Sequence, residues 1–238
     1  MAPLKSLYVE PEQVAPTEWP ALELIDVFKI YRSGPAETVA LRGLDLRVEP
    51  GELVAVLGPS GCGKSTMLAL AAGLDEPSAG EVRVFGRSLS RSDEKALSAY
   101  RARDLAIVFQ SDNLWPALSA QENVALSLRL AGRDSPDSAA AAALQAFGLA
   151  GRRTHRTAAL SGGEQQRVAI AAAAAREARL VLADEPTGEL DRRNERLVLD
   201  ALATLRRDRG STVVVVTHST RVASAADRVI EMLDGRTT

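Results

Sequence analysis

The chain has 238 residues, of which 46% are hydrophobic and 25% charged, which is typical of a globular domain with a sizeable buried core. The formal net charge of −2 argues against nucleic acid as the main partner, because such surfaces carry a broad excess of Lys and Arg. The single cysteine, Cys62, excludes an intrachain disulfide and favours a reducing compartment.

Residues 1–20 are rich in Pro and Glu and have no apolar period, so we expect a flexible N-terminal arm before a folded domain at 21–238. The arm lacks the apolar stretch of a signal peptide. Every apolar run in the chain is much shorter than the roughly 20 residues that span a bilayer. Any action at a membrane therefore requires a second, membrane-spanning chain.

The first part of the chain alternates between strand and helix patterns. Strands are predicted at 22–31 and 38–48, and the almost wholly apolar run 53–57 is typical of a strand buried on both faces. A Gly-rich loop and a helix over 64–73 follow. Strands at 81–85 and 105–109 flank a helix within 91–103.

The second part begins with an all-helical block from 119 to 148, which opens with capping-box spacing, S-A-Q-E. We then expect a helix over 162–176, a buried strand at 180–183, a helix over 194–207, and strands at 212–217 and 227–233. Strands that alternate with helices predict a parallel α/β core, which the helical block interrupts as an insertion.

The loop Gly58-Pro-Ser-Gly-Cys-Gly-Lys-Ser65 matches the phosphate-binding pattern G-x-x-x-x-G-K-[ST], between a buried strand and a helix. Its glycines let backbone N–H groups surround an anion at the positive end of the helix dipole. We predict that Lys64 reaches the β- and γ-phosphates, that Ser65 ligates Mg²⁺ and that Thr66 adds an α-phosphate contact. The predicted nucleotide loop comprises Gly58, Pro59, Ser60, Gly61, Cys62, Gly63, Lys64, Ser65 and Thr66, with Cys62 filling a small-residue position.

Two acids, Asp184 and Glu185, end the apolar strand at 180–183. A buried parallel strand delivers them to the edge of the sheet where α/β proteins bind ligands. We predict that Asp184 holds Mg²⁺ and that Glu185 orients and polarises the attacking water. A solvated strand end is the alternative, which the upstream phosphate loop makes less favourable.

The segment Leu160-Ser-Gly-Gly-Glu-Gln-Gln166 places two adjacent glycines at a helix start, where they are costly. They are useful if Ser161, Gly162 and Gly163 present a hydroxyl and N–H groups to an anion. Because this chain already has one phosphate loop, we expect that anion to be the nucleotide on a second copy.

The LSGGEQQR stretch resembles the signature motif of ATP-binding-cassette (ABC) ATPases, and the order of the motifs agrees over about residues 22–233. The resemblance implies a P-loop NTPase of ABC type: an α/β core with a small antiparallel β subdomain and an inserted α-helical subdomain at about 111–160. It also implies a head-to-tail homodimer that sandwiches two ATP molecules, with Mg²⁺.

Four further roles follow from the resemblance. Gln110 matches the glutamine that touches Mg²⁺ and reports the nucleotide state, and His218 matches the histidine that contacts the γ-phosphate. Tyr31 matches the aromatic residue that stacks on adenine, and Asp191 matches an aspartate at the dimer interface. His155 matches nothing. The implied catalytic residues are Lys64, Glu185 and His218; Gln110 joins Ser65 and Asp184 as metal ligands.

Two stretches, VFQSDNLWP and LADEPTG, are similar to subunits of the macrolide-efflux, lipoprotein-release and cell-division branch. Those subunits act from the cytoplasmic face on integral-membrane permeases, in export, extraction or force transmission. Glu189 and Ala172 depart from that branch, which usually has Asn and Arg there. The alternatives are a soluble ABC-type ATPase of DNA repair, chromosome organisation or translation, and a nucleotide-gated scaffold without turnover. Cargo and direction lie with the permease.

Overall fold

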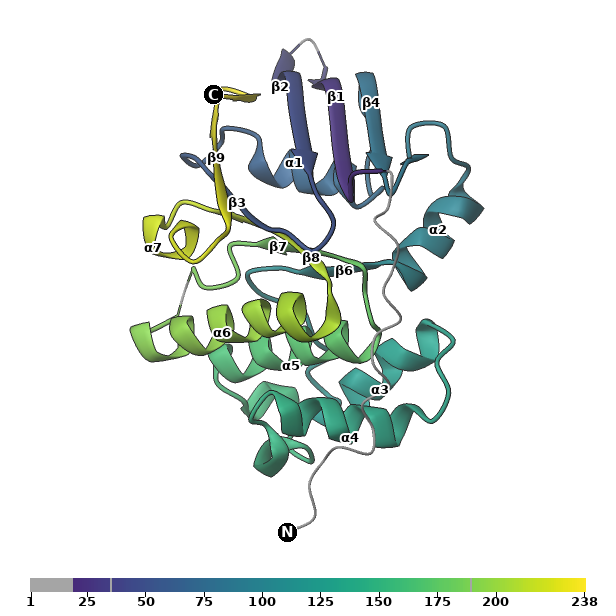
Figure 1. The fold of residues 1–238 in the computed structure, drawn as a ribbon, viewed down its shortest axis with the longest axis vertical. Helices are drawn as coiled ribbons and strands as arrows, with labels where there is room; N and C mark the ends of the chain where they lie inside the picture. Colours follow the sequence, from purple (N-terminus) through teal and green to yellow (C-terminus); the bar gives the residue numbers. More distant parts are fainter. Residues whose placement is uncertain (1–18, 35, 189) are drawn as a thin grey trace.

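Figure 1 shows the protein as a computed structural model, which describes residues 19–34, 36–188 and 190–238. The expected arm, up to residue 18, and Glu189 lie outside the described residues. Two sheets stand above a layer of helices, and the predicted α/β class with an antiparallel subdomain and a helical subdomain is confirmed. In the described part of the chain, no helix has the length and apolar character needed to cross a membrane.

The smaller sheet is antiparallel and has the strand order β2-β1-β4-β5. Its long hairpin carries register shifts around Asp26, whose backbone is left-handed at φ 46°. Such a shift bends the pair and tightens its twist. The strands are β1 (Leu22–Ser33), β2 (Ala36–Val48), β4 (Ala79–Val84) and β5 (Arg87–Ser88).

The larger sheet has the order β10-β9-β3-β8-β7-β6 and is parallel except for β10. The middle of each central strand is apolar because both of its faces are covered. The strands are β3 (Leu53–Leu57), β6 (Leu105–Val108), β7 (Leu180–Asp184), β8 (Thr212–Thr217), β9 (Arg228–Leu233) and β10 (Arg236–Thr237).

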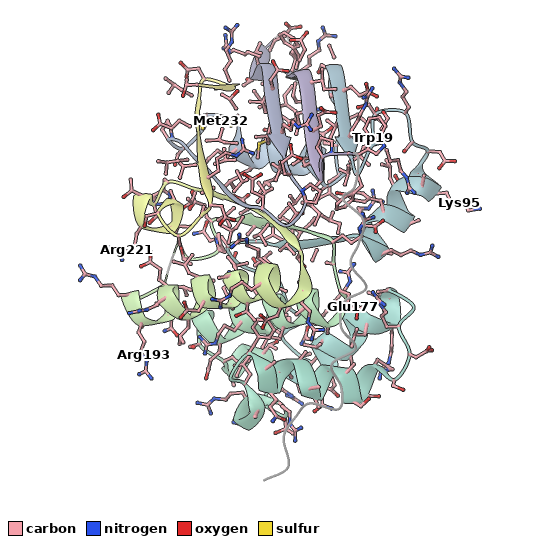
Figure 2. All side chains as sticks on the ribbon, viewed as in Figure 1. Trp19, Lys95, Glu177, Arg193, Arg221 and Met232 are labelled. Carbon is pink, nitrogen blue, oxygen red and sulfur yellow. The ribbon has the colours of Figure 1, made fainter. Side chains whose placement is uncertain are left out.

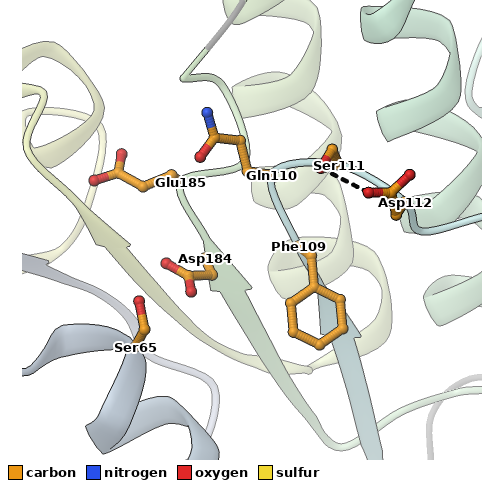
Figure 3. A pocket seen from close by; sticks show the side chains of 7 residues that line it. All are labelled: Ser65, Phe109, Gln110, Ser111, Asp112, Asp184 and Glu185. Atoms are coloured by element: carbon orange, nitrogen blue, oxygen red, sulfur yellow. Dashed lines mark hydrogen bonds between the residues drawn. The ribbon is translucent and has the colours of Figure 1, made fainter.

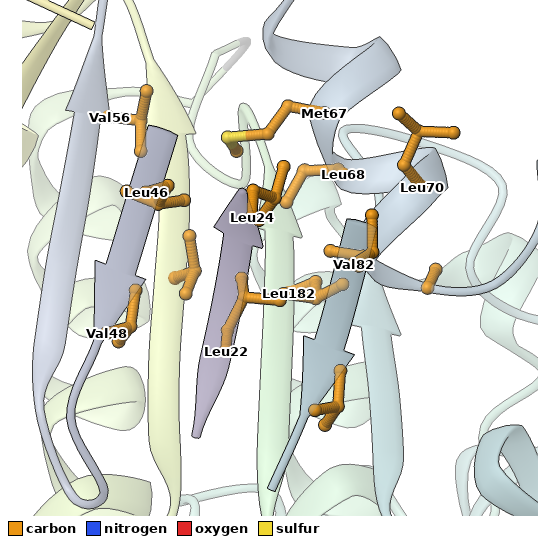
Figure 4. Close-up of a cluster of buried hydrophobic side chains, with 14 of the residues drawn as sticks. Leu22, Leu24, Leu46, Val48, Val56, Met67, Leu68, Leu70, Val82 and Leu182 are labelled. Atoms are coloured by element: carbon orange, nitrogen blue, oxygen red, sulfur yellow. The ribbon is translucent and has the colours of Figure 1, made fainter. Parts of the chain in front are cut away.

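The two faces of this sheet pack against different partners. Val214 and Val216 of β8 join a core with α1 (Lys64–Ala71) and the antiparallel sheet, part of which Figure 4 shows. Val213 and Val215 of the same strand join a second core, which the sheet shares with α5 (Gly162–Ala175) and α6 (Arg192–Arg209). The period-2 alternation of the strand therefore places α1 on one face and α5 on the other.

The helical block lies beyond α5, away from the sheet (Figure 1). The third hydrophobic core of the protein lies in this block and is built from small and branched residues of α3, α4 and α5. The predicted capping box at Ser119 and Glu122 is present. The remaining helices are α2 (Glu94–Arg103), α3 (Ala120–Leu130), α4 (Pro136–Ala146), α7 (Thr220–Ala223) and the 3₁₀ turns η1 (Ala150–Arg152) and η2 (Thr157–Ala159).

Candidate functional site

The phosphate-loop segment joins β3 to α1 in a conformation that needs glycine. Gly61 and Gly63 have φ values of 80° and 104°, which side-chain-bearing residues rarely adopt. A Cβ on Gly63 would lie 2.5 Å from the carbonyl oxygen of Ala40 on β2. The loop is therefore pressed against the antiparallel sheet while Pro59, Ser60 and Gly61 stay exposed.

The last hairpin, β9–β10, holds this loop from the other side. The N–H of Gly235 donates to the carbonyl of Cys62 at 3.0 Å, and the carbonyl of Gly235 accepts from the N–H of Arg42 at 3.0 Å. A Cβ on Gly58 would lie only 2.3 Å from the carbonyl oxygen of Met232, a β9 residue labelled in Figure 2. Two separate parts of the chain, β2 and the β9–β10 hairpin, thus fix the loop.

Lys64 is buried at 7% exposure, which excludes the alternative of a surface lysine on a Gly-rich turn. Its ammonium donates to the carbonyls of Gly58 at 2.7 Å and Pro59 at 2.9 Å, inside the curve of the loop. Its Nζ lies 4.0 Å from the sulfur of Cys62, which is itself buried. A buried cation is thus held at the loop by two backbone carbonyls and the Cys62 sulfur.

Figure 3 shows a pocket of about 530 Å³ at the carboxyl end of β6 and β7. The carboxylate of Asp184 points toward the hydroxyl of Ser65 across this pocket. Burial raises the pKa of Asp184 above its usual value; neighbouring Glu185 raises it further, while the Ser65 hydroxyl and Lys64 oppose the shift. The pocket is lined by Ser65, Phe109, Gln110, Ser111, Asp112, Asp184 and Glu185.

Glu185 sits in a sparsely populated backbone conformation, with φ 44°. Its N–H donates to the carbonyl of Val216 at 3.0 Å. Its Oε1 lies 2.8 Å from Nδ1 of His218, and its Oε2 accepts from the hydroxyl of Thr217 at 3.0 Å. The structure thus brings Glu185 and His218 together, as the motif order predicts, and adds Thr217, which sequence reasoning missed.

Gln110 lines the same pocket, and its backbone is tied to the helix that carries the signature segment. Gln166 of α5, only 4% exposed, donates its amide to the carbonyls of Phe109 at 2.8 Å and Gln110 at 2.6 Å. Asn113 closes the turn by donating to Gln166 and exchanging two bonds with Phe109. The sequence signal for this link is a glutamine on the apolar side of α5, which the sequence reasoning passed over.

Ser161, at the start of α5, has a structural task that the sequence interpretation missed. Its hydroxyl accepts from the N–H of Glu164 at 3.3 Å, and Glu164 accepts from the N–H of Ser161 at 2.9 Å, which is a capping box. A Cβ on Gly163 would lie 2.6 Å from Asn194 of α6. The segment therefore also has a role at the start of its own helix, besides the anion binding that the sequence predicts. Ser161 and Gly162 remain exposed, whereas Gly163 is buried.

Tyr31 lies near the loop because β1 and β2 pair Tyr31 with Thr38, two residues from Ala40. Its hydroxyl donates to Asp75 at 3.0 Å, and the ammonium of Lys29 lies 4.9 Å from its ring centroid. Tyr31 is 42% exposed, so ring surface remains for another planar group.

The other residues singled out from the sequence are placed as follows. Asp191 caps α6 by accepting from the N–H of Asn194 at 2.8 Å, a bond that lowers the pKa of its carboxyl. Thr66 is half-buried on α1. Ala172 is half-buried and packs against the core of the helical block. The side chain of His155 is exposed, and the hydrogen bonds of this residue are made by its backbone.

Comparisons with known proteins agree with this geometry. Residues 41–188 match the family described as ABC transporter. The chain is 46% identical to the lipoprotein-releasing system ATP-binding protein LolD of Ruegeria pomeroyi, over 91% of this chain and 96% of that protein. It is 46% identical to the macrolide export ATP-binding/permease protein MacB of Rhodopseudomonas palustris, over 90% of this chain and 33% of that longer protein.

A solved structure, the dimeric post-hydrolysis state of the ATP-binding cassette MJ0796 bound to ADP and Pi, superposes with a TM-score of 0.84. It is 38% identical and covers 91% of this chain and 96% of its own. The family match spans more than half of the chain, and the resemblance seen in the motifs is confirmed. The chain therefore belongs to the ABC transporter family of ATP-binding-cassette ATPases.

Proposed function

We propose that this protein is the ATP-hydrolysing subunit of an ABC transporter, which closes as a head-to-tail dimer and drives a conformational change in a membrane permease. One observation carries the proposal. The phosphate loop, the facing side chains of Ser65 and Asp184, and the bonded pair Glu185 and His218 meet at one edge of the parallel sheet. That edge is where α/β proteins bind nucleotides.

ATP binds with its phosphates against the loop from Gly58 to Thr66. The N–H groups at the start of α1 and the buried ammonium of Lys64 supply positive charge there. The phosphate oxygens then replace the loop carbonyls as partners of Lys64. Adenine stacks on Tyr31, whose ring is already oriented by Asp75.

The residues at this edge also fit Mg²⁺. Mg²⁺ prefers oxygen ligands and is commonly held by one or two carboxylates together with substrate phosphates. The hydroxyl of Ser65, the carboxylate of Asp184 and the side-chain oxygen of Gln110 line one pocket, and they are the groups that would hold the ion. When bound, it neutralises charge on the phosphates.

Glu185 orients a water for in-line attack on the γ-phosphate and polarises it. Its carboxylate is held against β8, so it is positioned before ATP arrives. His218, whose side chain is 62% exposed, is able to turn from Glu185 toward the γ-phosphate. Lys64 and His218 then stabilise the charge that develops in the transition state.

The second half of each site comes from another copy of the chain. The helices that begin at Lys64 and Gly162 cover opposite faces of the sheet, so one chain does not fold its own signature segment over its own loop. Ser161 and Gly162 are exposed, and together with the buried Gly163 behind them they close over the partner's γ-phosphate. The dimeric cassette MJ0796 supports this arrangement.

The partner on the membrane side is a permease, and the protein is peripheral at the cytoplasmic face through that contact. The names of the relatives, a lipoprotein-releasing system and a macrolide exporter, favour an export or extraction branch. The helical block at about 111–160 would carry the motion to the permease. It presents exposed apolar side chains at Trp115 (67%) and Leu130 (74%).

Two alternative functions predict different results from the proposed one. A soluble ATPase of DNA repair or translation would hydrolyse ATP at full rate without a permease. A nucleotide-gated scaffold would bind ATP and dimerise but not turn over, and the Glu185–His218 contact argues against it.

The experiment is Glu185→Gln. The variant should bind ATP with Mg²⁺ normally, lose at least about 100-fold in hydrolysis, and accumulate as an ATP-bound dimer in size-exclusion chromatography. Glu94→Gln, at an exposed carboxylate on α2, is the matched control and should behave as wild type. Wild-type turnover by Glu185→Gln would overturn the assignment of Glu185.

A further inference from the structure

Thr217 is the last residue of β8 and is almost fully buried, at 1% exposure. Its hydroxyl accepts from the N–H of Ser219 at 3.0 Å. The same oxygen lies 3.0 Å from Oε2 of Glu185. A carboxylate has no proton to give, and a hydroxyl has one, so the Thr217 proton points at Glu185.

The backbone of Thr217 is fixed independently of this side chain. Its carbonyl accepts from the N–H of Gly58, the first residue of the phosphate loop, at 3.3 Å. In the sheet it lies opposite Leu57, the last residue of β3. The donor that reaches Glu185 is therefore part of the same rigid edge that carries the phosphate loop.

The two partners of the Glu185 carboxylate differ in mobility. The side chain of His218 is 62% exposed and leaves Glu185 when it turns to a phosphate. Thr217 stays, because it is buried and its hydroxyl is oriented by Ser219. The backbone of Glu185 is itself in an unfavourable left-handed conformation, at φ 44°, so its side chain needs an external anchor.

We propose that Thr217 is a positioning residue for ATP hydrolysis: it holds the Glu185 carboxylate in register with the phosphate loop while His218 is engaged elsewhere. The inference rests on the proposed role of Glu185 and adds a residue to which neither the motifs nor the comparisons assign a task. Thr217 touches no reacting atom and acts through Glu185 alone.

The test is Thr217→Val, which keeps the shape of the side chain and removes the hydroxyl. We expect kcat to fall about 10- to 100-fold, because small misplacements of a catalytic group have effects of this size. KM and the Kd for ATP, measured with a fluorescent nucleotide, should change by less than about threefold, since no group at the phosphates is altered. Thr217→Ser restores the hydroxyl and should recover most of kcat.

Thr212→Val is the matched control. Thr212 begins the same strand, is equally buried at 1% exposure, and its hydroxyl accepts from the N–H of Gly51 at 2.9 Å. This variant loses a buried hydroxyl at the far end of β8 and should keep its kcat. If Thr217→Val turns over at the wild-type rate, or Thr212→Val and Thr217→Ser lose as much as Thr217→Val, the proposal is wrong.

Adding Thr217→Val to Glu185→Gln separates this proposal from the function on which it rests. The double variant should bind ATP and form the trapped dimer as Glu185→Gln does, because the anchor positions a group for hydrolysis, a step that Glu185→Gln no longer performs. If Glu185→Gln traps and the double variant does not, Thr217 acts on closure and the proposal is overturned. If Glu185→Gln itself hydrolyses normally, the proposed function has failed first.

Discussion

Asp184 and Glu185 are neighbours in the chain but experience different surroundings. Glu185 is bonded to Thr217 and His218, whereas Asp184 is half-buried and faces Ser65. Burial is the largest influence on Asp184 and raises the pKa of its carboxyl. Ionisation of the Asp184 carboxyl therefore costs free energy in the protein without nucleotide. A bound cation would offset that cost.

Asp184→Asn should raise the melting temperature of the nucleotide-free protein while abolishing Mg²⁺-dependent hydrolysis. The sign follows from linkage: a carboxyl whose folded pKa is raised costs stability once it is ionised. The gain should be largest at neutral and alkaline pH. It should shrink as the pH falls through the raised pKa toward about 3.9, the unfolded value. Calorimetry across pH measures it; a gain that grows on acidification would contradict the assignment.

Ser161 shows where residue-level sequence reasoning was incomplete. The spacing from Ser161 to Glu164 is itself a capping-box signal. The two glycines between them led instead to the prediction of an anion site. Gly163 is required in any case, because a side chain there would collide with Asn194. One short segment thus caps its own helix and still exposes donors at Ser161 and Gly162. These two roles are distinguished by the three-dimensional structure and not by the sequence.

The link between α5 and the turn after β6 joins two motifs that are distant in the sequence. Gln166 holds the carbonyls of Phe109 and Gln110, so the helix that begins with the signature segment moves together with the backbone of Gln110. In the proposed dimer, this link would connect the nucleotide on one chain to the segment that faces the other chain's nucleotide.

Gln166→Leu should destabilise the protein by about 1–3 kcal/mol, because it removes the buried amide that donates to the carbonyls of Phe109 and Gln110. It should also weaken the cooperativity of ATP hydrolysis. Gln165→Leu is the control: that half-buried neighbour donates to Leu160 within the start of the same helix. Urea unfolding and the Hill coefficient of ATPase titrations measure both effects. Equal behaviour of the two variants would exclude a special role for Gln166.

The long elements were predictable from the sequence, and the shortest were not. Apolar runs such as Leu53–Leu57 and Thr212–Thr217 identify buried parallel strands from their composition alone. In contrast, β5 and β10 have two residues each, and α7 has four. Such pieces have too little local pattern, and they form because the surrounding structure pairs and caps them.

Across the molecule, the sheet divides the two halves of the nucleotide site. The helix of Lys64 packs on one face and the helix after Ser161 on the other. Sequence order predicted both halves, but it said nothing about the faces on which they lie. The faces follow from strand alternation, which requires a known register, and they make the second copy a geometric necessity for the proposed site.

Mixing two inactive variants should therefore restore activity. Lys64→Ala loses the phosphate loop's cation, and Ser161→Arg blocks the signature segment, so each homodimer has two defective sites. In a head-to-tail heterodimer, one site combines the intact loop of one chain with the intact signature of the other. ATPase activity that appears only in the mixture would support the arrangement. If each variant stays as active alone as wild type, a composite site is excluded.

The bond from Gly235 to Cys62 also has a consequence for the order of folding. A loop near the start of the domain is completed by a hairpin roughly 170 residues later, which is a contact of high sequence separation. On the ribosome, the chain would present the phosphate loop long before β9 and β10 exist. Nucleotide should therefore stabilise the finished chain but not nascent intermediates that lack the hairpin. ATP binding would then stabilise only chains that have completed the last step of folding.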